Sequence, residues 1–151
     1  MTTYDEAQLL IRLLREGRDY YAFACDETRD TETAAVFALA LKARHDLLED
    51  LVATRLLFQT SPAHAVRTLE ADLGYEELRH QFDALLPQAH AAALLARERR
   101  VVDLMQDLFD GEPAAHSPRL QSVLKTHYAR FVEIEDCFAR WSQRHELVAA
   151  A

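Results

Sequence analysis

Apolar residues recur at helical spacing along almost the whole chain, and few residues interrupt them. The first such stretch carries Leu9, Leu10, Leu13 and Leu14, a spacing that places apolar side chains on one face of a helix. Only 3 Gly and 4 Pro, the residues that most often end or kink a helix, occur among the 151 residues. The sequence therefore predicts an all-α fold of long helices, and its length suits one domain, residues 1–151.

Start and stop signals divide this pattern into four long helices. Capping residues, Ser-Pro pairs and glycines predict long helices over about 3–29, 31–58, 87–110 and 117–145. Pro87 either kinks the chain or opens the third of them. The connection between the second and third, about 59–86, is long and partly helical, with helices expected over 62–73 and 75–86. Two helical hairpins joined by such a crossover place the second and third long helices parallel to each other.

Composition and charge narrow the class of protein. The net charge of −8 argues against a nucleic-acid partner, because phosphate contacts need a basic surface. The longest apolar tract, 89–96, is far shorter than the roughly 18 residues of a membrane span, and the N-terminus lacks a signal-peptide pattern. We therefore expect a cytoplasmic protein with no membrane partner. Cys25 and Cys137 have no Cys-x-x-Cys spacing, so we expect both to be reduced and buried.

The second and fourth predicted helices resemble each other. Residues 31–55 align without gaps on residues 117–141, and the match pairs Arg44 with Arg130. The first and third helices align more weakly and place Glu16 near Glu98. This relationship is a candidate internal repeat of one helical hairpin.

Residues 13–51 carry a recognisable order of features. Glu16-Gly17 precedes a Tyr-x-x-Ala from Tyr21, a short polar turn follows, and Arg44 stands seven residues before a leucine. This pattern resembles the ferritin-like superfamily, and within it an uncharacterised branch of small bacterial four-helix-bundle proteins, a domain of unknown function. The resemblance implies a ferritin-like four-helix bundle with internal two-fold pseudo-symmetry and implies no established activity.

Di-iron carboxylate proteins of that superfamily take a Glu from each of two helices and a Glu-x-x-His from each of the other two. Transferred by register, these positions are occupied by Glu16, Leu41, Arg44, Glu98, His127 and Arg130. Leucine and arginine cannot ligate a metal, so the candidate metal ligands are Glu16, Glu98 and His127. We expect no cofactor, with iron or manganese at this reduced site as the alternative.

The two arginines fall in the core-facing register. An unpaired buried charge costs several kcal/mol, so an inward Arg44 or Arg130 needs an acidic partner. Glu16 and Glu98 are the natural candidates. We therefore expect buried Glu–Arg pairs to stand in place of the metal cluster.

Two stretches of the chain resemble features of other helical families. A one-residue slip of register turns His45 and Glu49 inward, a spacing found in hemerythrin-like bundles, but such sites need several more facing histidines. The stretch LLPQAHAA (85–92) faintly resembles a haem-ligand helix of globins, and the internal repeat and Pro87 count against it.

No Gly-rich phosphate loop, Gly-x-Ser-x-Gly or Cys-His constellation is present. The expected function is therefore a non-enzymatic, structural or protein-interaction role, with a homodimer as one form of it. The alternative is a metal-binding ferritin-like protein or oxidase with the reduced carboxylate and histidine site.

Overall fold

The computed structural model describes residues 3–54, 74–83, 87–110 and 118–150. These residues contain no strand, and the predicted all-α class is confirmed for them. The helices are α1 (Thr3–Glu27), α2 (Thr31–Ala53), α3 (Glu76–His80), α4 (Pro87–Asp110) and α5 (Pro118–Ala150).

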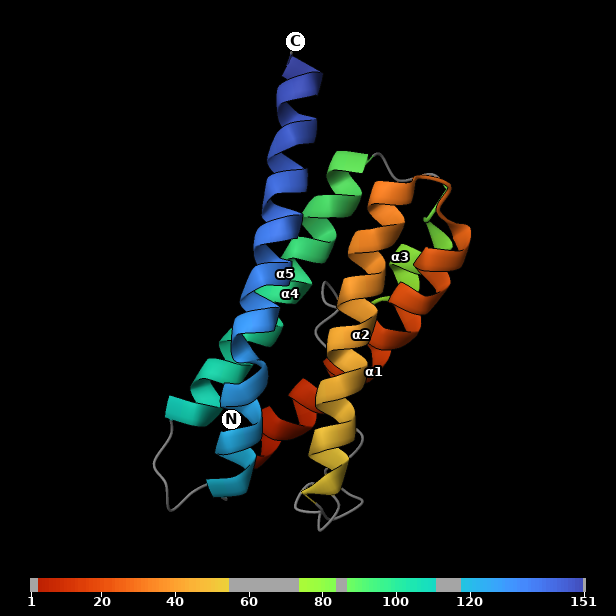
Figure 1. Ribbon diagram of the computed structural model, residues 1–151. Helices are drawn as coiled ribbons and strands as arrows, with labels where there is room; N and C mark the ends of the chain where they lie inside the picture. Colours follow the sequence, from red (N-terminus) through yellow and green to blue (C-terminus); the bar gives the residue numbers. More distant parts are fainter. Residues whose placement is uncertain (1–2, 55–73, 84–86, 111–117, 151) are drawn as a thin grey trace.

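The four long helices form a ring of neighbours. α1 packs against α2 and α4 packs against α5, and the two hairpins meet where α2 contacts α5 and where α1 contacts α4. α2 and α4 therefore face each other across the interior. Figure 1 shows that α2 and α4 run in the same direction, and that α1 and α5 run in the opposite one.

Local signals account for several helix ends. Asp30 caps α2, because its side chain accepts a hydrogen bond of 3.0 Å from the backbone N–H of Thr33. α4 opens at Pro87, where proline is tolerated because the first-turn N–H has no helical partner. α5 runs on past the expected end at His145, to Ala150. The expected helix 62–73 and the last residues of the expected second helix lie outside the described residues.

The crossover differs from the prediction where it is described. A helix is expected over 75–86, and within the described residues 75–83 α3 covers only Glu76–His80. Gln81 leaves helical geometry with φ −95° and ψ 7°, and the residues after it form a turn. A single helical turn gains little from its own hydrogen bonds, so its length follows from packing rather than from propensity.

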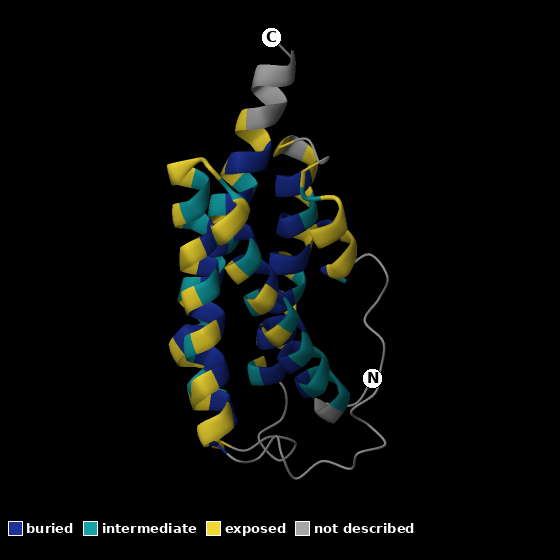
Figure 2. Cartoon of the chain, turned by 90° about the vertical axis from the view of Figure 1, so that its right-hand side faces the viewer, coloured by how far each residue is buried: buried dark blue, intermediate teal, exposed yellow. Residues whose placement is uncertain are grey.

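The core lies where the four long helices meet, and Figure 2 shows buried residues lining that interior with exposed residues on the outer sides. One part of it is aromatic and joins three helices. Tyr21 of α1 stacks on Phe138 of α5 with ring centroids 5.9 Å apart, and Phe37 of α2 lies 5.8 Å from Tyr21. Full burial of each such ring contributes about 1.5–3 kcal/mol.

Among the described residues, no helix has the length and apolar character needed to cross a membrane.

Candidate functional site

The centre of the bundle holds a buried ion pair between Arg44 of α2 and Glu98 of α4. Arg44 Nη1 lies 2.7 Å from Glu98 Oε1, and both side chains are 0% exposed. Because α2 and α4 are not neighbours in the ring, the pair spans the interior from one helix to the facing one. Removing either partner would leave an uncompensated charge in a site that water does not reach.

Two tyrosine hydroxyls extend the ion pair. The Tyr21 hydroxyl donates to Glu98 Oε1 at 2.5 Å, and Arg44 Nη2 donates to the Tyr75 hydroxyl at 3.2 Å. Burial raises the pKa of both tyrosines, and the Glu98 carboxylate raises that of Tyr21 further. Both hydroxyls therefore stay neutral. We call Tyr21, Arg44, Tyr75 and Glu98 the central polar cluster.

The faces of two aromatic rings contact the Arg44 guanidinium in addition to its ion pair and hydrogen bond. Arg44 Nε and Glu98 Oε2 are buried and have no hydrogen-bond partner among the residues that the structure describes. The Arg44 guanidinium lies 4.8 Å from the centroid of the Tyr21 ring and 5.9 Å from that of Phe131. Such cation–π contacts are strongest where water is excluded. The guanidinium is thus held by one carboxylate, one hydroxyl and two rings.

Gly17 of α1 leaves the space that Arg44 occupies. A Cβ atom at this position would lie 2.3 Å from Arg44 Nε and 3.0 Å from the Tyr75 hydroxyl. A glycine in a helix costs roughly 0.5–1 kcal/mol relative to alanine, so its presence here is explained by the close approach of the guanidinium. Gly17 belongs to the sequence pattern of 13–51, but its role could not be inferred from that pattern.

Arg97 of α4 fastens the end of the crossover to the cluster. Its Nε and Nη2 donate to the carbonyl of Gly74 at 3.2 and 2.5 Å, and its Nη1 donates to the carbonyl of Ala93 at 2.7 Å. The guanidinium also lies 5.3 Å from the centroid of the Tyr75 ring. Neither Tyr75 nor Arg97 was predicted as a site residue. The one local signal was Gly74, which marks the end of the predicted crossover helix directly before Tyr75.

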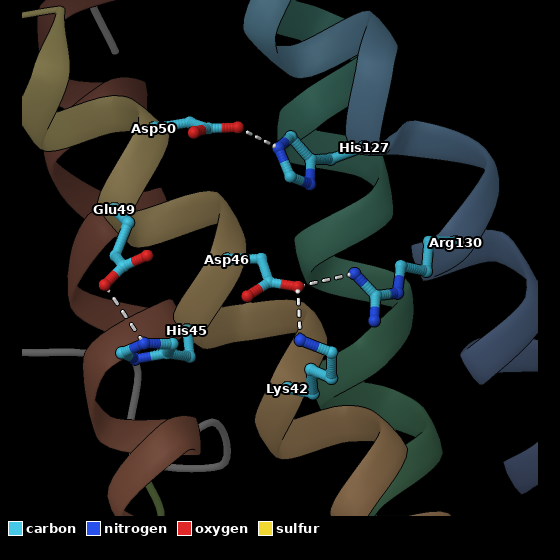
Figure 3. Close-up of polar contacts among 7 residues, drawn as sticks. All are labelled: Lys42, His45, Asp46, Glu49, Asp50, His127 and Arg130. Carbon is cyan, nitrogen blue, oxygen red and sulfur yellow. Dashed lines mark hydrogen bonds and ion pairs between the residues drawn. The ribbon is translucent and has the colours of Figure 1, made fainter.

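The structure differs from the expected buried pairs at Glu16 and Arg130. Glu16 pairs with Arg12 of its own helix at 3.0 Å, and each side chain is 37% exposed. Arg130 donates to Asp46 of α2 at 2.9 Å across the α2–α5 boundary, with 35% of its side chain exposed (Figure 3). Both side chains are partly exposed to water and form their ion pairs near the surface, so neither needs a partner in the core.

The three candidate metal ligands have separate surroundings. Glu98 contacts Arg44 and Tyr21 in the core, and Glu16 lies at the surface of α1. His127 Nε2 lies 2.6 Å from Asp50 Oδ2, also at the α2–α5 boundary (Figure 3). Within the described ranges, no group of three or more His, Cys, Asp or Glu side chains is placed to hold a metal ion.

His45 and His90, the histidines that suggested a hemerythrin-like or a globin-like helix, lie in different surroundings. His45 is exposed on α2 and pairs with Glu49 at 3.2 Å, away from the core (Figure 3). His90 is buried, and its Nε2 hydrogen-bonds to the Tyr20 hydroxyl. Burial lowers the pKa of His90 to about 4, so its imidazole is neutral at pH 7.

A pocket of about 450 Å³ lies near the start of α2 and beside α5, apart from the central polar cluster. It is lined by Glu32, Thr33, Val36, Cys137, Arg140, Trp141 and Arg144. Its charged groups already have partners within it, because Arg140 donates to Cys137 Sγ at 3.4 Å and Arg144 lies 3.9 Å from Glu32. Cys25 and Cys137 are both free thiols and are half-buried, less buried than expected.

No protein-family model, curated protein or solved structure matches the chain. The ferritin-like resemblance therefore remains a prediction from residues 13–51.

Proposed function

We propose that this chain is a non-enzymatic, cytoplasmic member of the ferritin-like superfamily in which a buried ion pair has replaced the di-metal centre, and that it acts through contacts with other proteins. The observation that carries the proposal is the Arg44–Glu98 pair at the centre of the bundle, 2.7 Å long and 0% exposed. A carboxylate facing the interior is what a metal centre in a helical bundle would use.

The charge of Arg44 opposes metal binding at this position. A guanidinium is always protonated, has no lone pair to donate, and repels a divalent cation at short range. For Glu98 to ligate a metal, it would have to release Arg44, whose guanidinium would then be buried and unpaired at a cost of about 3–5 kcal/mol. In this proposal the central polar cluster orients the helices and carries out no reaction.

The arrangement of the helices supports the ferritin-like part of the proposal. Two hairpins are joined by one long connection, and α2 and α4 run parallel (Figure 1). Ferritin-like bundles contain one long crossover of this kind.

The outside of α2 supports an interaction role. Among the described residues, the exposed large hydrophobic side chains are Leu39 and Val52, which are 51% and 49% exposed. Both belong to α2, and exposed alanines lie beside them on the same helix. Exposed apolar positions with charged residues between them give one helix the mixed surface that suits a protein partner.

The proposal is tested by elemental analysis of protein purified without a His tag, followed by anaerobic titration with Fe²⁺ and Mn²⁺. We expect far less than one metal ion per chain and no saturable binding. Stoichiometric iron or manganese would overturn the proposal and favour the alternative, a metal-binding protein or oxidase that uses Glu16, Glu98 and His127. In that case His127→Ala should reduce the bound metal.

A further inference from the structure

The outward side of α2 has an ordered pattern of exposed residues. We call it the α2 outer face, and its members are Ala35, Ala38, Leu39, Lys42, His45, Glu49, Val52 and Ala53, all exposed. They recur at spacings of three and four residues, so they share one side of the helix. Read along the chain, the face is apolar, then positive, then negative, then apolar again.

This order is symmetric about a point in the second half of α2. Leu39 and Val52 lie equally far on either side of the point between residues 45 and 46. The same holds for Lys42 and Glu49, and for Ala38 and Ala53. Apolar residues are thus matched with apolar residues, and the one lysine is matched with a glutamate.

A face with this symmetry complements a second copy of itself in one orientation. In a two-fold dimer with antiparallel α2 helices, each of these six residues meets its counterpart, so Lys42 of each chain meets Glu49 of the other. The apolar ends meet at the same time. A parallel arrangement would place Lys42 on Lys42 and Glu49 on Glu49, which is unfavourable.

The charged members of the face are free to make these contacts. Lys42 is 66% exposed and Glu49 is 68% exposed. Their ion pairs within the chain run along α2 itself, from Lys42 to Asp46 at 3.2 Å and from His45 to Glu49 at 3.2 Å (Figure 3). Exposed pairs of this kind are worth about 0–1 kcal/mol and rearrange at little cost.

We infer that the α2 outer face is the interface of an antiparallel homodimer. The inference rests on the proposed function, because it names the partner of the same interacting surface. Charge complementarity of the face with itself is the reason to name a second copy of this chain rather than a different protein.

The test measures mass in solution by multi-angle light scattering and sedimentation over a range of concentrations. We expect wild-type protein to approach twice the chain mass of 17.3 kDa as the concentration rises. Lys42→Glu and Glu49→Lys should each weaken self-association by roughly tenfold or more, because each creates two like-charge contacts per dimer. The double variant K42E/E49K, and an equal mixture of the two single variants, should restore the dimer.

Lys125→Glu is the matched control, because Lys125 is an exposed lysine on α5. It should leave the mass unchanged, and circular dichroism should show the same helicity for every variant. A wild-type monomer at all concentrations, a dimer that tolerates both single changes, or a double variant that stays monomeric would overturn the inference. These mass measurements are independent of the metal measurement. The proposed function would be overturned by a different result, stoichiometric binding of metal.

Discussion

Replacing Arg44 by alanine is the perturbation to which the bundle should be most sensitive. The change removes the 2.7 Å ion pair with Glu98, the hydrogen bond to Tyr75 and the contact with the Tyr21 ring. Among the described residues, it leaves the buried Glu98 carboxylate with the Tyr21 hydroxyl as its remaining partner. Breaking a buried ion pair on one side costs about 3–5 kcal/mol, and we expect a loss of about 4 kcal/mol for Arg44→Ala.

Urea denaturation followed by circular dichroism measures this loss. For a chain of this size, about 4 kcal/mol corresponds to a drop in Tm of roughly 10–15 °C. Arg130→Ala is the matched control, since Arg130 is the repeat counterpart of Arg44 and pairs with Asp46 while 35% of its side chain is exposed. That change should cost less than about 1 kcal/mol. Equal effects of the two substitutions, or an unchanged Tm for Arg44→Ala, would refute the reasoning.

Two further predictions concern positions next to the cluster. Gly17→Ala should destabilise the wild type by about 1–3 kcal/mol, because its Cβ would overlap Arg44 Nε. The same change should cost less in the Arg44→Ala background. Equal shifts of the urea midpoint in both backgrounds would contradict this prediction. The His90 pKa of about 4 lies below the ordinary 6.5, so the unfolded chain takes up a proton that the folded chain does not. The free energy of unfolding should therefore be highest above pH 6.5 and fall by about 3 kcal/mol as the pH drops to 4. His90→Gln should make this dependence on pH weaker. An identical dependence in the variant would exclude His90 as its source.

The helices were predictable because their signals are local. Asp30 caps α2 from within its own turn, and Pro87 begins α4 without reference to the rest of the fold. The crossover was not predictable in the same way. Residues 75–86 carry helical periodicity, but of the described residues 75–83 only one turn, Glu76–His80, is helical, since its extent depends on packing against other segments.

The inward arginine was predictable at Arg44, but its partner was not. The internal repeat made Glu16 and Glu98 equally suitable as partners of Arg44. In the structure the two differ, because Glu98 is buried and Glu16 lies at the surface. Glu98 receives a hydrogen bond from Tyr21, whereas the position that corresponds to Tyr21 in the other hairpin is Asp103, an exposed acid that cannot donate to Glu16. Which of two similar carboxylates enters the core therefore depends on the facing side chain, which the repeat did not identify.

The measurement that tests the central claim most directly is a double-mutant cycle on Arg44 and Glu98. Urea denaturation of Arg44→Ala, Glu98→Ala and the double variant gives the coupling energy between the two side chains, free of their other contacts. If the buried ion pair holds the bundle together, each single variant should be strongly destabilised and the double variant little more so, with a coupling of about 2–3 kcal/mol. A coupling near zero, with additive losses, would show that the two side chains do not act as a pair.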